Sequence, residues 1–295
     1  MPSLKEVRNR IESVKSTGQI TNAMKMVAAS KLRRAQDAIL RLRPYSKKLN
    51  EIIGNITLTT GLTESNPYAQ RPGEPNRVLI VAVSSNKGLC GMFNMGVIKS
   101  VLSLMNGELK SFTENGQTDL LCIGKKVHEY FIKRGTPVLG EHNDIFQQLT
   151  FDNAQMIATT LLDGYEKGQW DRIVVVYNRY KNAALQIVTQ EQFLPIAEVP
   201  STSGDEFWGI DYLYEPEKEE ILREMIPRAL RIQFYKMLLD SYASEHGARM
   251  TAMHQATENA GEMLKELRLA YNKARQATIT REIIEIVSGA EALKE

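Results

Sequence analysis

The chain has 295 residues, of which 43% are hydrophobic and 24% charged, the proportions of a globular protein with one large domain or two modest ones. The longest apolar run, residues 78–83, is far shorter than the ~18 residues that a membrane-spanning helix needs, so we expect a soluble, cytosol-facing protein. The two cysteines, Cys90 and Cys122, are too few for a disulfide framework or a Cys-based zinc site, and we expect reduced thiols.

Charge is distributed unevenly along the chain. Residues 1–48 contain twelve Lys or Arg and three Asp or Glu, a net charge of +9, so the rest must carry −7 to give the overall +2. A basic arm of this kind is typical of binding to RNA, to a membrane surface or to an acidic protein. The sign of the charge alone does not choose among these partners.

A single long helix is predicted from Ser3 to about Ile56. No Pro interrupts residues 4–43, and apolar residues recur at alternating steps of three and four. A stripe that repeats every 3.5 residues keeps one face against a supercoiled partner helix. The two seam positions are Leu4, Ile11, Gly18, Lys25, Leu32, Ile39, Ser46 and Ile53, and Val7, Val14, Thr21, Ala28, Ala35, Leu42, Leu49 and Ile56.

Two features interrupt this helix. Pro44 predicts a kink, because it lacks the backbone N–H of a helix interior. Gly18, Thr21 and Lys25 are small or polar seam residues in succession, which cannot form a dry apolar core. We therefore expect something other than the coiled coil to contact the helix there.

A compact α/β domain is predicted over residues 75–200, after a polar linker rich in Thr, Gly, Asn and Pro. Strands alternating with helices favour a Rossmann-like fold with a mostly parallel sheet that is covered on its faces. The expected strands are residues 77–85, 118–123, 172–180 and 188–194, and the expected helices are residues 95–105, 125–134 and 152–166.

The C-terminal segment, residues 210–295, is predicted to be helical almost to its end, with a kink or restart at Pro227. From Pro227 to Ser288 there is no further Pro, and a helix of that length extends roughly 90 Å. We expect it to pair in antiparallel fashion with the N-terminal helix, residues 1–58, so that the termini lie together. Its predicted seam is Met253, Ala256, Ala260, Met263, Leu267, Ala270, Ala274, Ala277 and Ile284.

The best candidate for an enzymatic site is the loop of residues 84–91 after the first strand, since a loop before a helix can hold a phosphate. It lacks the dinucleotide glycine pattern, and Gly124-Lys125-Lys126 lacks the Walker spacing. Cys90 has no recognisable His base nearby in the sequence. We therefore interpret the loop as a tight turn and Cys90 as a packing residue.

Two terminal segments resemble the signatures of one family, the gamma subunits of F-type ATP synthases. Residues 13–33, Ser-Val-Lys-Ser-Thr-Gly-Gln-Ile-Thr-Asn-Ala-Met-Lys-Met-Val-Ala-Ala-Ser-Lys-Leu-Arg, are similar to the N-terminal signature. Residues 272–280 and 282–290 are similar to the C-terminal one. Gly88-Leu89-Cys90-Gly91 with Asn94, and residues 212–216, Tyr-Leu-Tyr-Glu-Pro, also fit.

The resemblance implies a noncatalytic rotor shaft, present in one copy, that transmits torque between the membrane c-ring and the catalytic beta subunits. Its partners would be three alpha and three beta subunits, the epsilon subunit and the c-ring, with no nucleic acid, cofactor or metal. The complex would lie at the cytoplasmic face of a bacterial plasma membrane. The implied contacts with beta are Met24, Lys25, Arg249, Arg275 and Gln276; those of the c-ring and epsilon foot are Tyr212, Tyr214 and Glu215; those of the apical bearing are Ile283, Ile284, Ile286 and Val287.

Two other functions remain open from the residues alone. The basic arm is consistent with an RNA-binding coiled coil, whose binding would fall steeply with salt. A nucleotide-using enzyme would bind or turn over nucleotide as an isolated chain.

Overall fold

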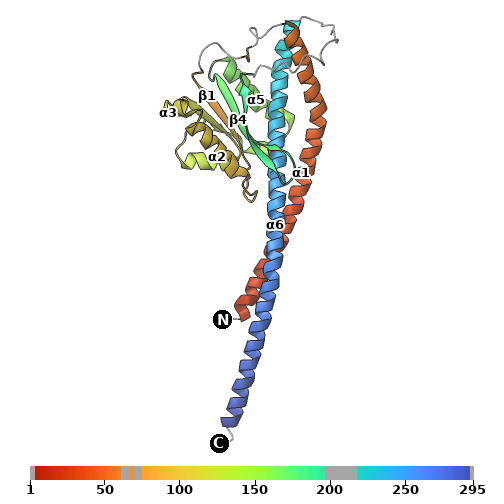
Figure 1. The fold of residues 1–295 in the computed structure, drawn as a ribbon, viewed down its shortest axis with the longest axis vertical. Helices are drawn as coiled ribbons and strands as arrows, with labels where there is room; N and C mark the ends of the chain where they lie inside the picture. Colours follow the sequence, from red (N-terminus) through yellow and green to blue (C-terminus); the bar gives the residue numbers. More distant parts are fainter. Residues whose placement is uncertain (1–3, 61–66, 70–74, 197–217, 293–295) are drawn as a thin grey trace. The chain divides into compact units, whose positions relative to one another are not determined.

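The computed structural model describes residues 4–60, 67–69, 75–196 and 218–292. Its contacts divide the chain into two units (Figure 1). The coil unit comprises residues 1–28 and 249–295, and the sheet unit comprises residues 29–248. Helix α1, Leu4–Thr60, and helix α6, Lys218–Ala292, each contribute to both units.

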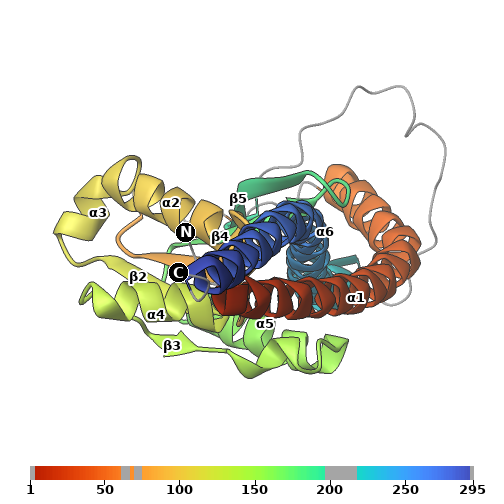
Figure 2. The same ribbon diagram turned by 90° about the horizontal axis from the view of Figure 1, so that it is seen from below.

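In the coil unit, α1 and α6 lie side by side (Figures 1 and 2), and they run in antiparallel fashion, as predicted (Figure 1). The Arg8 guanidinium donates a hydrogen bond to the Tyr271 hydroxyl at 3.0 Å, and the Thr21 and Thr257 hydroxyls are 2.8 Å apart. The residue of α1 with the higher number therefore contacts the residue of α6 with the lower number, which shows that the two helices run in opposite directions. By this register α6 continues past Leu4, the first described residue of α1, so the two described helix ends do not lie level.

The predicted seam of α1 is confirmed by its burial. Val7, Ala28, Leu32, Ala35, Ile39 and Leu49 are all at most 7% exposed. The expectation that Gly18 and Thr21 contact something other than the coil is wrong for these two residues. A Cβ at Gly18 would lie 3.5 Å from the Ala260 Cβ, and Thr21 is bonded to Thr257. The missing side-chain volume is taken up by close approach of α6.

The predicted seam of α6 is correct up to Ala260, and beyond it the seam is wrong at Met263, Ala270, Ala277 and Ile284. Met263, Ala270 and Ala277 are exposed, whereas Leu264 and Tyr271 are half-buried. The predicted seam is rich in small residues, which would allow the two backbones to approach closely. The structure instead places a leucine and a tyrosine on the buried side, and Tyr271 contacts Arg8 there.

In the sheet unit, five strands form a sheet of order β3-β2-β1-β4-β5. Strands β1 (Val78–Val83), β2 (Thr118–Ile123), β3 (Gly140–Glu141) and β4 (Arg172–Tyr180) are parallel, and β5 (Gln186–Leu194) is antiparallel to β4. The predicted strands at residues 118–123 and 172–180 have the observed bounds. The two-residue β3 is too short to carry a sequence period, and it was missed.

Successive side chains along each strand point to opposite faces of the sheet, so the core is divided into two layers. Helices α2 (Phe93–Asn106) and α4 (Lys125–Lys133) cover one face. Helices α5 (Phe151–Glu166) and α6 cover the other. The remaining helical segments are α3 (Lys110–Glu114), which was not predicted, and the 3-10 turn η1 (Asp144–Phe146). The long C-terminal helix is thus itself a core element of the sheet unit.

Neither long helix stops at its proline. Pro44 lies within α1 and Pro227 within α6, so the predicted restart at Pro227 is wrong. Each proline removes one backbone donor, and packing on the remaining turns maintains the helix. Among the described helices, none is both long and apolar enough to cross a membrane.

Candidate functional site

The loop after β1, the candidate phosphate site, is closed by hydrogen bonds from the N-terminus of α4. The first backbone N–H groups of α4 are all engaged: Lys125 donates to Asn86 Oδ1 at 3.0 Å, Lys126 to the Ser85 carbonyl at 3.1 Å and Val127 to Ser84 Oγ at 3.1 Å. Helix N-termini bind phosphate through such N–H groups when they are free. A phosphate at the N-terminus of α4 would have to displace these three bonds, which tie the loop to α4 as a structural turn.

The Gly-Leu-Cys-Gly motif with Asn94 has a structural role in the same loop. The Asn94 Oδ1 atom accepts hydrogen bonds from the backbone N–H and the hydroxyl of Ser85, both at 3.0 Å, and its Nδ2 atom donates to Cys90 Sγ at 3.2 Å. Leu89 and Gly91 adopt φ of +63° and +59°, the left-handed region in which glycine is favoured. Cys90 is 1% exposed, which does not suit a nucleophile.

The other titratable side chains of the sheet unit also have structural environments. Burial, with a smaller effect of Glu141, raises the pKa of the Cys122 thiol to about 12, and burial lowers the pKa of His142. His128 Nδ1 lies 2.6 Å from Glu141 Oε2. Over the part of the chain that the structure describes, no group of three His, Cys, Asp or Glu could hold a metal ion.

The predicted beta-subunit contacts fall into two separate places on the coil unit. Met24 and Lys25 are half-buried on α1, and Arg249 on α6 is 8% exposed and interacts within the chain. The antiparallel register places Lys25 near Met253, one helical turn from Arg249. The structure therefore brings these three residues to one stretch of the coil.

Arg275 and Gln276 lie roughly 40 Å from Arg249 along α6. Both are exposed. The Arg8 hydrogen bond lowers the pKa of the neighbouring Tyr271, and the Arg275 charge contributes to the same direction. Arg275 and Gln276 are therefore accessible to a partner at this end of the coil.

The C-terminal turns of α6 expose apolar side chains. Ile283, Ile284, Ile286 and Val287 are 55%, 59%, 71% and 52% exposed. An exposed apolar surface of this kind indicates an interaction site. The predicted foot residues Tyr212, Tyr214 and Glu215 lie outside the described residues.

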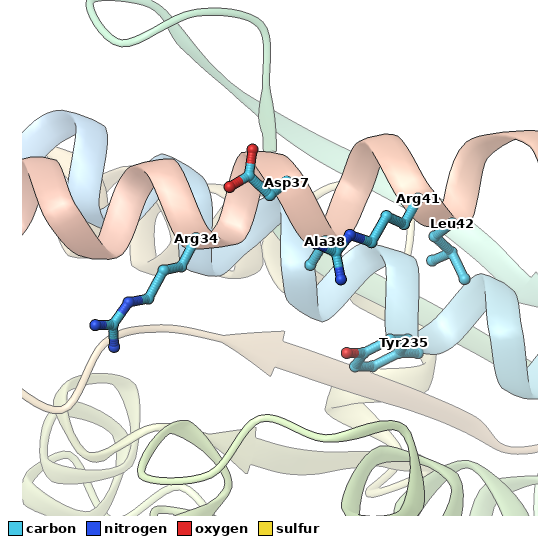
Figure 3. A pocket seen from close by; sticks show the side chains of 6 residues that line it. All are labelled: Arg34, Asp37, Ala38, Arg41, Leu42 and Tyr235. Carbon is cyan, nitrogen blue, oxygen red and sulfur yellow. The ribbon is translucent and has the colours of Figure 1, made fainter.

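A basic groove in the sheet unit was not identified from the sequence. It has a volume of about 450 Å³ and lies between α1 and α6 (Figure 3). Its lining residues are Arg34, Asp37, Ala38, Arg41, Leu42 and Tyr235. A neighbouring hollow of about 360 Å³ adds Arg43, Lys47 and Lys236. Both favour an acidic partner, and only the packing of α6 against α1 reveals them.

Comparison with known proteins gives matches along the whole chain. A family described as ATP synthase matches residues 3–293. The ATP synthase gamma chain of Cytophaga hutchinsonii is 51% identical over 294 residues, covering 99% of both chains. That of Flavobacterium psychrophilum is 50% identical over 298 residues, covering 100% of both.

Two solved structures share the fold. A chain of the mitochondrial ATP synthase of Euglena gracilis has a TM-score of 0.67 at 20% identity, covering 98% of this chain and 94% of that one. A chain from the central stalk and c-ring structure of the Tetrahymena thermophila mitochondrial ATP synthase has a TM-score of 0.58 at 25% identity. It covers 80% of this chain and 99% of that one.

Proposed function

The chain belongs to the family of ATP synthase gamma chains, and we propose that it is the noncatalytic rotor shaft of a proton-translocating F-type ATP synthase. One copy would turn inside a ring of three alpha and three beta subunits, with the epsilon subunit and the c-ring at its foot. Association with the membrane would be peripheral, through the complex, at the cytoplasmic face of a bacterial plasma membrane.

The observation that carries this proposal is the exposed apolar end of α6. Ile283, Ile284, Ile286 and Val287 are more than half exposed, although burial of such side chains in an apolar environment is favourable by about 1.5–3 kcal/mol each. A hydrophobic bearing at the top of the bore would cover them while the helix turns. At 3.6 residues per turn, these four side chains lie on one side of the helix, within an arc of about 160°, and a bearing would cover this apolar face.

Torque transmission follows from contacts that differ among equivalent subunits. A shaft without threefold symmetry presents a different surface to each of three beta subunits, so each catalytic site acquires a different affinity for nucleotide. Rotation exchanges these surfaces, and the change in contact free energy becomes a change in binding free energy. This role requires no side chain of the shaft to touch a phosphate, in agreement with the closed loop after β1.

Individual residues support separate steps of this coupling. Arg275 and Gln276, both exposed, would hydrogen-bond a beta-subunit loop at one orientation of the shaft. Met24 and Lys25 offer partly exposed surface to an acidic region of beta, and the buried Arg249 would support that surface from within the coil unit. The foot would include Tyr212, Tyr214 and Glu215.

The experiment that tests the proposal replaces Arg275 and Gln276 together with Ala in the assembled complex. Loss of charge-assisted hydrogen bonds worth about 1.5–3 kcal/mol should reduce coupled ATP synthesis by roughly tenfold or more. Arg268→Ala is the matched control, because Arg268 is an exposed cation on the same helix. Unchanged synthesis by the double variant would contradict the proposed contact.

Composition of the complex is tested independently by native mass spectrometry of the chain extracted gently with its partners. One copy with three alpha and three beta subunits is the expected result. Recovery of the chain alone or with RNA would reject the shaft proposal and favour the RNA-binding alternative.

A further inference from the structure

The C-terminal end of β4 contacts three different helices of the sheet unit. The Ser244 hydroxyl of α6 donates to the Asn178 backbone carbonyl at 3.0 Å. The Asn178 Nδ2 atom donates to the Phe93 carbonyl of α2 at 3.3 Å. On the same strand, the Tyr180 hydroxyl accepts a 2.6 Å hydrogen bond from Gln36 of α1.

The two contacts of Asn178 lie in a dry part of the molecule, and the Gln36–Tyr180 contact is partly buried. Ser244 is fully buried and Asn178 is 2% exposed. A buried hydrogen bond is costly to break, because the polar group left behind is not compensated by water. The strand end is therefore held in a fixed position relative to the sheet-unit portions of both long helices.

The turn that follows β4 contacts α6 one helical turn further on, at Gly247. A Cβ at Gly247 would lie 3.2 Å from the Ala183 carbonyl oxygen and 3.4 Å from its Cα, so the turn packs backbone against backbone. The turn is itself rigid, since Asn182 Oδ1 accepts the N–H groups of Ala184 at 3.0 Å and Leu185 at 2.7 Å. A larger side chain at Gly247 would push this turn away from the helix.

We propose that the end of β4 and the turn after it form a torque-bearing joint, through which the sheet turns together with α1 and α6. This β4 joint consists of Asn178, Tyr180 and Ala183 against Gln36, Ser244 and Gly247. The inference rests on the proposed shaft function and assigns these six residues a positioning role in it.

The need for such a joint follows from the length of α6. Gly247 lies roughly 40 Å from the beginning of the helix at Lys218. Over this distance α6 packs on the sheet through apolar side chains such as Leu230 and Phe234, and the β4 joint adds polar and backbone contacts at its far end. Fixing the sheet to the helix at Ser244 and Gly247 lets the sheet share a load on the helix, so rotation at one end is delivered to the other with less elastic lag.

The test compares Gly247→Val with Gly261→Val in the assembled complex in inverted membrane vesicles. Both residues lie within α6, but nothing lies within 4 Å of a Cβ at Gly261, so the control carries the same change in helix propensity without the clash. We expect Gly247→Val to keep ATP hydrolysis within twofold and to lower proton pumping per ATP hydrolysed at least threefold. The control should leave that ratio unchanged.

A second variant preserves shape and guards against misfolding. Ser244→Ala combined with Tyr180→Phe removes both hydroxyls of the joint with little change in volume, and should lower the pumping ratio about twofold. A ratio equal to that of the unmodified complex in this double variant overturns the proposal. If the unmodified chain itself does not assemble with alpha and beta or support pumping, the proposed function fails, whatever the variants do.

Discussion

The Thr21–Thr257 pair offers a quantitative test of how the coil unit is stabilised. Their hydroxyl oxygens are 2.8 Å apart, and Thr257 also donates to the Met253 carbonyl at 2.7 Å. Because a hydroxyl has one proton, Thr257 uses its own on Met253. Thr21 is then the donor in the bond between the helices, in preference to its longer 3.1 Å contact with the Gly18 carbonyl.

Replacing either threonine with valine should destabilise the chain, and replacing both should not. Each single change loses one hydrogen bond worth about 1 kcal/mol and leaves its partner's oxygen facing an apolar group. The double variant loses the same bond once and buries two methyl groups, each contributing about 0.8 kcal/mol. We therefore expect Thr21→Val to cost about 1 kcal/mol and the double variant to be at least as stable as the original chain.

The measurement is urea-induced unfolding of the full chain, followed by far-ultraviolet circular dichroism for the four members of the cycle. Thr17→Val is the control, since the Thr17 hydroxyl bonds only within α1 on an exposed face. It should change the free energy of unfolding by less than about 0.5 kcal/mol. The proposed coupling between the helices is refuted if the change in the free energy of unfolding of the double variant equals the sum of the two single changes to within about 0.3 kcal/mol.

Two predictions concern the sheet unit. Gly164→Ala should destabilise the chain by about 3 kcal/mol or more in urea unfolding, because a Cβ there would lie 2.8 Å from the Trp170 Cε3 atom and still closer to Cζ3; a stable variant would contradict the packing of α5. Burial raises the pKa of Asp240 to about 6 from 3.8, against the opposing effects of Lys236 and Arg43. The folded chain therefore holds more protons than the unfolded chain between about pH 4 and 6, so the free energy of unfolding falls as pH rises through this range and stays lower above it. Asp240→Asn should remove this fall and stabilise the chain at pH 7 by up to roughly 3 kcal/mol, as measured by unfolding at pH 4.5 and 7; an unchanged pH slope would contradict it.

Much of the local structure followed from the sequence. The 3.5-residue stripe of α1 is a property of one segment, and its buried positions are those predicted. Strands β2 and β4 were located correctly because apolar runs of buried parallel strands are distinct from their polar surroundings. The terminal signatures indicated the family, and the whole-chain matches confirmed it.

The register between the long helices could not be obtained in this way. On α6 the predicted seam was the stripe with the most regular 3.5-residue repeat, and that repeat placed Met263 rather than Leu264 on the buried side. The partner decides the question, since Arg8 of α1 selects Tyr271 for the buried side. Similarly, Gly18 and Thr21 interrupt the seam when α1 is considered alone, and fit it once Ala260 and Thr257 lie opposite.

The sequence by itself determined the longer helices, the main strands and the family, because periodicity and signatures are properties of consecutive residues. Tertiary structure alone decided the β4 joint and the closed loop after β1. Each depends on atoms from segments far apart in the chain, such as Ser244 with Asn178 and Val127 with Ser84. Hydrogen bonds need distances near 3 Å, and no linear pattern specifies which distant groups come that close.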